Sequence, residues 1–215
     1  MVDSNKDILL IDKPKGITSF DIIRRLRRGL GKKKMGHAGT LDPLASGLMI
    51  IGVGNGTKKL HEYLKLPKTY IAEVLIGEKR STGDMEGEVV ESKKVESLKR
   101  AEVERVLKEM IGVLRLSVPI YSAVKVGGKR LYKEARKGRK VIIPLRDMEI
   151  KDTQLLGMKK DKDQYVLSVR FDVESGVYIR SLAEEFGRRL GYPATIKELR
   201  RIKIGDFDIK DAQSI

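Results

Sequence analysis

The sequence predicts an α+β fold, and three observations support that class. Residues 165–173 alternate apolar and polar side chains, which is the period of a strand with one buried face. Apolar side chains recur at helical spacing in residues 20–30 and 182–190. Strands and helices follow one another without regular alternation, which argues against a parallel βαβ array. Because 40% of the 215 residues are hydrophobic, the chain can bury one core, and we expect a single domain over residues 1–215.

The first part of the chain is expected to form a strand, a turn and a helix. Residues 8–11 are a short apolar run typical of a buried strand. Thr18 stands three residues before Asp21, which is the spacing of a capping box and predicts the start of an amphipathic helix. That helix is expected to end at Gly29 and Gly31. Further buried strands are expected over residues 48–53 and 70–76, and a loop over residues 81–87.

The second part of the chain contains the clearest strand. A charged helix is expected over residues 103–110, ended by Gly112. The alternating strand at 165–173 is followed by a turn, by a second short strand at 177–180, and by a helix closed at Gly191. The expected local order is therefore strand, turn, strand and helix.

Composition restricts the function before any motif is considered. The chain has 45 Lys and Arg against 30 Asp and Glu, a formal charge of +15, which favours a polyanionic partner such as nucleic acid. Cysteine is absent, which excludes disulfides and thiol chemistry, and with two histidines we expect no metal site. No apolar run reaches the roughly 18 residues of a membrane span, and no signal peptide opens the chain, so we expect a cytoplasmic protein.

Two basic segments are candidates for contact with phosphates. The first covers residues 24–34 and contains several cations but no acidic residue. An ordinary solvent-exposed helix face interleaves positive and negative side chains, so this pattern favours contact with phosphates. The second covers residues 119–138 and interleaves cations with Tyr121 and Tyr132, although tyrosines are more often packing residues. The residues expected to contact nucleic-acid phosphates are Arg24, Arg27, Arg28, Lys32, Lys33, Lys125, Lys129 and Arg130.

The motifs of common enzyme classes are missing from the sequence. It contains no P-loop, no dinucleotide-binding glycine pattern, no His-Glu-x-x-His and no Gly-x-Ser-x-Gly, so an enzyme here would rely on a carboxylate. Residues 36–47 place three glycines around Asp42, which is followed by Pro43. Taken alone, this segment is equally typical of a turn.

The same segment, Gly36 to Gly47, resembles the signature loop of the TruB-type tRNA pseudouridine synthases, and residues 12–19 resemble the N-terminal motif of that family. The resemblance extends over roughly residues 8–212. Three further segments match in order: Lys68-Thr69-Tyr70, Gly176-Val177-Tyr178-Ile179-Arg180-Ser181-Leu182 and Glu198-Leu199-Arg200-Arg201.

The resemblance implies an isomerase that converts one uridine in the T-loop of tRNA, position 55, to pseudouridine without a cofactor. It implies the pseudouridine synthase fold, a mixed and largely antiparallel central sheet flanked by helices. It also implies an RNA-gripping insertion, the thumb, over about residues 117–145. Many relatives continue into a C-terminal PUA-type domain, which we do not expect in this chain because it stops soon after Ala212. The implied partner is the T-stem-loop of tRNA, with no membrane and no obligatory protein partner, and we expect a monomer.

The resemblance also assigns the site residues. Asp42 corresponds to the essential aspartate, Arg180 to the arginine that pairs with it, and Tyr70 to the active-site tyrosine that stacks on the flipped uracil. Further substrate contacts are implied for His37, which would fill the space left by the flipped base, and for Tyr178 and Leu199, which would wall the pocket. The sequence departs from the family pattern at Phe20, Ser46 and Val177, none of which is one of these residues.

One carboxylate suits the implied reaction. Pseudouridine formation breaks the N1–C1′ bond, turns the uracil and rejoins it through C5, so a rigidly held nucleophile or base is sufficient. An arginine beside Asp42 would favour its ionised form. The residue types leave open whether Asp42 attacks C1′, attacks C6 or removes a sugar proton. Extruding the base costs a few kcal/mol, which stacking on tyrosine can offset.

Two other functions remain open at this point. One is a guide-RNA-dependent synthase of the same superfamily, although residues 44–47 look more like the stand-alone type. The other is a catalytically silent RNA-binding or RNA-chaperone protein. The presence of Asp42, Tyr70 and Arg180 together argues against a silent protein.

Overall fold

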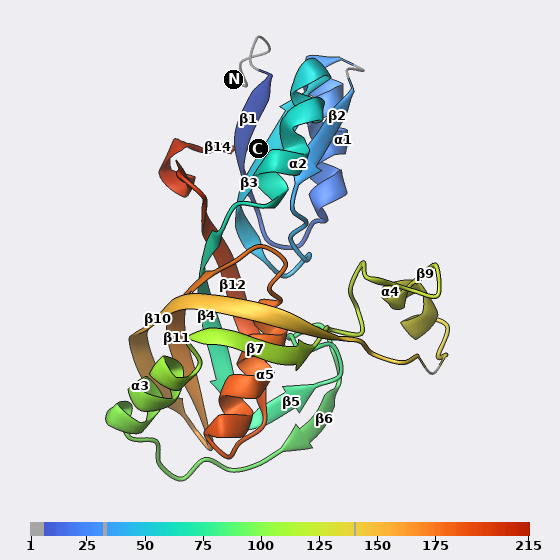
Figure 1. Ribbon diagram of the computed structural model, residues 1–215. Helices are drawn as coiled ribbons and strands as arrows, with labels where there is room; N and C mark the ends of the chain where they lie inside the picture. The colour runs from blue at the N-terminus through green and yellow to red at the C-terminus, as the bar shows by residue number, and fades with distance from the viewer. Residues whose placement is uncertain (1–6, 32–33, 140) are drawn as a thin grey trace. The chain divides into compact units, whose positions relative to one another are not determined.

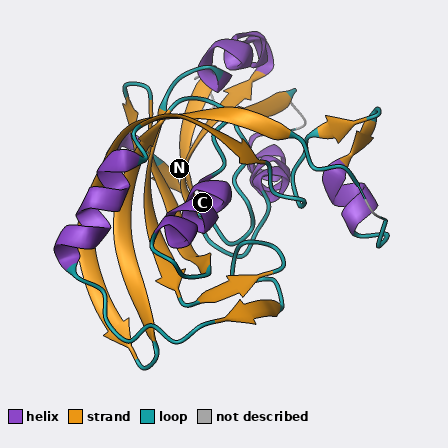
Figure 2. Ribbon diagram, turned by 60° about the horizontal axis from the view of Figure 1, so that its bottom comes forward, coloured by secondary structure: helices purple, strands orange, loops and turns teal. Residues whose placement is uncertain are grey.

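The computed structural model describes residues 7–31, 34–139 and 141–215, which form a mixed, largely antiparallel sheet flanked by helices (Figures 1 and 2). This confirms the α+β class. The chain divides into two compact units, each described by itself: unit 1 contains the residues up to Ile71 and Glu198–Ile215, and unit 2 contains Ala72–Lys197.

The elements of unit 1 begin with β1 (Ile8–Lys13) and α1 (Ser19–Leu30). Then come β2 (Met35–Ala38), β3 (Ser46–Val53), the 3-10 turn η1 (Gly54–Lys59), α2 (Leu60–Leu64), β13 (Phe207–Asp208), η2 (Ile209–Asp211) and β14 (Gln213–Ser214). Two strands, β4 (Lys68–Ile76) and β12 (Ala194–Ile204), have residues in both units.

The elements of unit 2 are β5 (Glu78–Arg80), β6 (Val89–Ser92), α3 (Arg100–Glu109), β7 (Gly112–Ser117), β8 (Lys125–Val126), β9 (Lys129–Arg130), α4 (Leu131–Ala135), β10 (Leu145–Asp161), β11 (Gln164–Val173) and α5 (Ile179–Arg189). The strand order of the sheet is β14-β1-β3-β12-β4-β11-β10-β7, with β2 beside β3 and β13 beside β12. In the part of the chain that is described, no helix is both long and apolar enough to cross a membrane.

Helix α1 starts where the sequence predicts. The Thr18 hydroxyl accepts a hydrogen bond from the Asp21 amide (3.1 Å), and the Asp21 carboxylate accepts one from the Thr18 amide (2.8 Å), so the capping box is confirmed. The helix buries Ile22, Ile23 and Leu26. Helices α1 and α2 both pack against β2 (Figure 1). The capping box thus orients an amphipathic helix whose apolar face covers this edge of the sheet.

The expected strands at 8–11, 48–53, 70–76 and 165–173 are confirmed as parts of β1, β3, β4 and β11. In β11, every second side chain from Tyr165 to Val173 is buried. The expected charged helix is α3, which buries Val103, Val106 and Leu107 and packs against β10. Helix α5 packs against β7.

The second short strand expected at residues 177–180 is wrong. Tyr178 is the N-cap of α5, and Ile179 and Arg180 form its first turn. The β-branched pair Val177 and Ile179 favours extended backbone, but a helical start buries Ile179 on the same face as Leu182 and Phe186. Burial of that apolar face therefore overrides local propensity.

The basic segment forms an insertion between β7 and β10, defined here as residues 118–144. It contains β8, β9 and α4, and it stands away from the rest of unit 2 in both views (Figures 1 and 2). Its small core consists of Val118, Val124 and Leu131, together with Met148 of β10. The insertion therefore has a hydrophobic cluster of its own, joined to the sheet at its base.

Candidate active site

Asp42 lies half-buried in a loop between β2 and β3, the Asp42 loop (residues 39–45). The Asp42 carbonyl accepts a hydrogen bond from the Ala45 amide at 3.1 Å, which closes a turn. Gly47 follows the loop with φ +113°, and a Cβ there would lie 2.2 Å from the backbone oxygen of Arg201. Only glycine fits at this point, where Gly47 of β3 pairs with Arg201 of β12.

The N-terminal segment holds both neighbours of Asp42. The Ser19 hydroxyl donates to the Leu41 carbonyl (3.0 Å) and accepts from the Leu41 amide (2.9 Å). The Gly16 amide donates to the Pro43 carbonyl at 2.8 Å. The ammonium of Lys13, which is fully buried, donates to the carbonyls of Ile17 (2.7 Å), Pro14 (2.9 Å) and Pro43 (3.4 Å). This cation is thus solvated by backbone oxygens, as a buried charge requires.

Two arginines of β12 hold the ends of the same loop. Arg201 is 1% exposed, and its guanidinium donates to the carbonyls of Leu48 (2.8 Å) and Gly39 (3.2 Å). Arg200 donates to Asp12 (2.6 Å) and to the Ser46 hydroxyl (3.2 Å). In the sequence these two arginines were identified only as part of a motif. In the structure, both donate hydrogen bonds that hold the ends of the Asp42 loop.

His37 lies half-buried on β2, opposite Ile51 of β3. Burial lowers the pKa of its imidazole below the ordinary value of 6.5, and the positive charge of Arg201 lowers this pKa further, whereas a hydrogen bond with the Gly39 backbone opposes the shift. The neutral imidazole is therefore favoured at pH 7. A neutral ring is suited to packing against a base.

Tyr70 and Leu199 belong to adjacent strands of unit 1. Tyr70 lies on β4 and Leu199 on β12, and each side chain is 8% exposed. Neither residue is on a loop. Two rigid strands therefore fix the positions of both predicted substrate contacts.

Arg180 and Tyr178 lie in unit 2. Arg180 is 6% exposed, and its guanidinium donates to the carbonyls of Thr82 (2.9 Å) and Tyr121 (3.1 Å). It also lies 3.7 Å from a carboxylate oxygen of buried Asp84. Tyr178 packs against the hydrophobic cluster at the base of the insertion. Since Asp42 is in unit 1 and Arg180 in unit 2, their pairing stays a prediction.

Sequence reasoning missed Asp84, because residues 81–87 were expected only to be a loop. Its carboxylate accepts hydrogen bonds from the Thr82 hydroxyl (2.5 Å) and the Glu86 amide (3.1 Å). A lone aspartate two residues after a threonine is the one sequence signal for this arrangement. Asp84 and Arg180 form a buried ion pair at 3.7 Å, and because both groups are buried, the charge of each stabilises the charge of the other.

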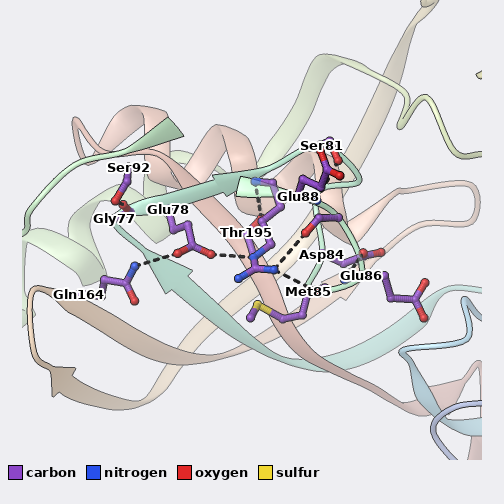
Figure 3. Close-up of polar contacts among 12 residues, drawn as sticks. Gly77, Glu78, Ser81, Asp84, Met85, Glu86, Glu88, Ser92, Gln164 and Thr195 are labelled. Carbon is purple, nitrogen blue, oxygen red and sulfur yellow. Dashed lines mark hydrogen bonds and ion pairs between the residues drawn. The ribbon is translucent and has the colours of Figure 1, made fainter. Parts of the chain in front are cut away.

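Arg80 supports the loop that carries Asp84, and Figure 3 labels Glu78, Asp84, Met85 and Thr195 of the surrounding network. The Arg80 guanidinium donates to Glu78 (2.6 Å) and to the carbonyl of Gly87 (3.0 Å). The Arg80 amide donates to the Thr195 hydroxyl at 3.2 Å. This network joins β5 to β12 within unit 2 and closes the loop on both sides of Asp84.

The predicted phosphate contacts differ in exposure. Arg24 and Arg28 are exposed on α1, whereas Arg27 is half-buried and donates weakly to the Met35 carbonyl (3.4 Å). Arg24 forms an ion pair with Asp21, and together with the Thr18 hydrogen bonds, which have the largest effect, it lowers the pKa of Asp21 to about 2. Lys125, Lys129 and Arg130 are all exposed on the β8–β9 hairpin. Lys32 and Lys33 lie outside the described residues.

Within residues 7–31, 34–139 and 141–215, no group of three or more His, Cys, Asp or Glu side chains is arranged to hold a metal ion. The sequence's expectation of cofactor-free chemistry stays a prediction. The site residues that the structure describes are Asp42, Asp84, Arg180, Tyr70, Tyr178, Leu199 and His37.

Solved structures with this fold define the class. The chain is similar to one in the crystal structure of a Cbf5-Nop10-Gar1 complex, with a TM-score of 0.70 and 26% identity, over 97% of this chain and 52% of that one. It is also similar to one in the structure of an H/ACA RNP bound to a substrate RNA containing 2′-deoxyuridine, with a TM-score of 0.68 and 23% identity, over 96% and 50%. The chain thus spans about half the length of these two chains, and its fold is that of a pseudouridine synthase.

Sequence comparisons give the family. Residues 27–179 match the model described as TruB family pseudouridylate synthase (N terminal domain). Proteins described as tRNA pseudouridine synthase B are 38% identical over 209 residues in Mycobacterium bovis and 40% over 211 residues in Geobacillus thermodenitrificans; both matches cover 97% of this chain and 70% of the relative. The chain belongs to the TruB family of pseudouridylate synthases, which makes it an isomerase.

Proposed function

We propose that this protein converts uridine 55, in the T-loop of tRNA, to pseudouridine. The observation that carries the proposal is the 38–40% identity, along almost the whole chain, to proteins described as tRNA pseudouridine synthase B. The Asp42 loop supports it, because hydrogen bonds hold the backbone on both sides of Asp42, and a carboxylate on a fixed backbone can meet a sugar or a base with little reorganisation. The strong positive charge of the chain fits a tRNA substrate.

In this proposal Asp42 is the catalytic residue, and Arg180 keeps it ionised and oriented. Tyr70 stacks on the extruded uracil, with Tyr178 and Leu199 at the walls of the pocket. His37, neutral at pH 7, fills the space that the base leaves. Asp84 orients the Arg180 guanidinium through the buried ion pair in unit 2.

The protein works without a guide RNA and as a monomer in the cytoplasm. The support for a stand-alone enzyme is that the identity to tRNA pseudouridine synthase B is higher than the 26% identity to the chain of the Cbf5-Nop10-Gar1 complex. The exposed hairpin cations Lys125, Lys129 and Arg130 then bind the phosphates of the T-stem.

The experiment is pseudouridine formation in an unmodified tRNA transcript by the purified protein alone, with the modified position mapped. We expect conversion at uridine 55 only, and none with Asp42→Asn, although this variant should still bind tRNA. Asp206→Asn, at an exposed turn of unit 1, is the matched control and should retain the wild-type rate.

Three results would contradict the proposal. Conversion by Asp42→Asn at the wild-type rate would remove Asp42 from its catalytic role. Conversion only after a guide RNA is added would favour the guide-dependent type. Tight, salt-sensitive binding with no conversion under either condition would favour an RNA-binding protein that lacks the reaction.

A further inference from the structure

Ser19 combines burial with two hydrogen bonds to a single residue of the Asp42 loop. It is the first residue of α1 and is 2% exposed. Its hydroxyl donates to the Leu41 carbonyl at 3.0 Å and accepts from the Leu41 amide at 2.9 Å. Leu41 directly precedes Asp42 and is 4% exposed. One side-chain oxygen therefore satisfies both backbone groups of the residue next to the catalytic carboxylate.

We infer that Ser19 is a positioning residue for Asp42, and this inference rests on the proposed function of Asp42. The Ser19 hydroxyl fixes the backbone plane on the N-terminal side of Asp42, and the Gly16 amide fixes the Pro43 carbonyl on the C-terminal side (2.8 Å). With both neighbours held, the backbone that carries the Asp42 carboxylate is fixed in place. Catalysis is sensitive to such placement, because a displacement of about 1 Å can cost about a hundredfold in rate.

A hydroxyl is the group that this position requires. It can donate and accept at once, which a methyl group cannot do, and water cannot easily replace it at a buried site. If the hydroxyl is lost, the Leu41 amide and carbonyl must find other partners, and the chain must move to reach them. That movement occurs one residue away from Asp42.

The neighbouring Thr18 provides a matched control. Thr18 caps the same helix through Asp21 and is exposed, and none of its hydrogen bonds described above reaches the Asp42 loop. Thr18→Ala therefore weakens the start of α1 without removing a hydrogen bond to Leu41. Ser19→Ala removes both hydrogen bonds to Leu41 and leaves the capping box in place. Comparing the two variants separates positioning from helix stability.

The experiment measures the single-turnover rate of pseudouridine formation at saturating tRNA, together with tRNA affinity and Tm, for both variants. For Ser19→Ala we expect the rate to fall at least tenfold, about 1.4 kcal/mol in the barrier, with tRNA affinity within threefold of wild type. Thr18→Ala should lower Tm but keep the rate within twofold. Ser19→Thr, which keeps the hydroxyl, should recover most of the rate.

All variants are assayed at least 10 °C below their own Tm, and Ser19→Cys serves as the test if Ser19→Ala does not fold, since a thiol keeps the volume but bonds weakly. A wild-type rate in Ser19→Ala, or in the Cys variant in its place, would overturn the inference. An equal loss of rate in Thr18→Ala would also overturn it, because helix stability would then be the cause. Asp42→Asn in the same assay distinguishes the two proposals: if it stays active, the proposed function fails, whatever Ser19 does.

Discussion

The Asp42 loop and the insertion both connect strands and both carry predicted functional residues, but they are held in different ways. The Asp42 loop receives hydrogen bonds from Ser19 and from Arg201, which is more than 150 residues away in sequence. The insertion is held by a small hydrophobic cluster that it shares with Met148 of β10 and by the hydrogen bond from Arg180 to the Tyr121 carbonyl, and Ile142 near its end is 85% exposed. In the proposed function this difference has a reason, because catalysis requires fixed geometry of the Asp42 loop, whereas gripping RNA benefits from an insertion that can adapt.

The largest expected effect on stability comes from replacing a glycine next to the Asp42 loop and, for comparison, a glycine in the insertion. Gly47→Ala places a Cβ 2.2 Å from the Arg201 backbone at φ +113° and should destabilise the protein by about 3 kcal/mol or more. Gly127→Ala in the insertion has a positive φ of +57° but open space, so about 1 kcal/mol is expected. Urea unfolding of both variants measures the difference. Equal destabilisation would show that the loop is no more tightly packed than the insertion.

Truncation of a buried arginine should have the next largest effect. Arg201→Met leaves the carbonyls of Gly39 and Leu48 without their donor, and we expect a loss of about 2–4 kcal/mol in stability. Arg130→Met on the exposed hairpin of the insertion is the matched variant and should change stability by less than about 0.5 kcal/mol. The measurement is the free energy of unfolding of each variant, compared with that of the wild type. A stability loss below about 1 kcal/mol in Arg201→Met would contradict the assigned role of Arg201 in holding the loop.

The cations of the insertion should affect binding and leave the chemical step unchanged. Replacing Lys125, Lys129 and Arg130 by serine should lower tRNA affinity and reduce the slope of log affinity against log salt by roughly 0.7–0.9 for each phosphate that is no longer neutralised. The single-turnover rate at saturating tRNA should stay near wild type. Binding measured at several salt concentrations checks the slope. An unchanged slope would mean that these cations do not contact phosphate.

The smallest expected effect is the pH dependence that His37 introduces into the stability of unit 1. Its folded pKa lies below 6.5, so as the pH falls below 6.5 the unfolded chain takes up the proton more readily, and stability decreases. The stabilising contribution is fully present above pH 6.5 and is lost as the pH falls towards the folded pKa. Unfolding between pH 7 and 5 should show a weaker pH dependence in His37→Asn than in wild type. His61→Asn on α2 is the control, and an equal change in both variants would exclude His37 as the source.

Much of the fold could be predicted because its elements have clean local patterns. The capping box of α1 and the alternation of β11 were both predicted correctly. Two long strands were not predicted. Strand β10 is exposed over most of its 17 residues, so it lacks an apolar pattern, and β12 places Arg201 at a buried position where an apolar residue would be expected. The backbone carbonyls that satisfy Arg201 explain this exception, and no local pattern indicates them.

The sequence by itself determined the α+β class, the start of α1, the basic character of the insertion and the motif that contains Asp42. Only the tertiary structure decided that Ser19 holds Leu41, that Arg201 holds Gly39, and that residues 179–180 begin α5. The first group could be predicted and the second could not because their interactions differ in sequence separation. Caps and alternating strands depend on neighbours a few residues apart, whereas these hydrogen bonds join residues 22 and 162 positions apart and exist only once the sheet has its register.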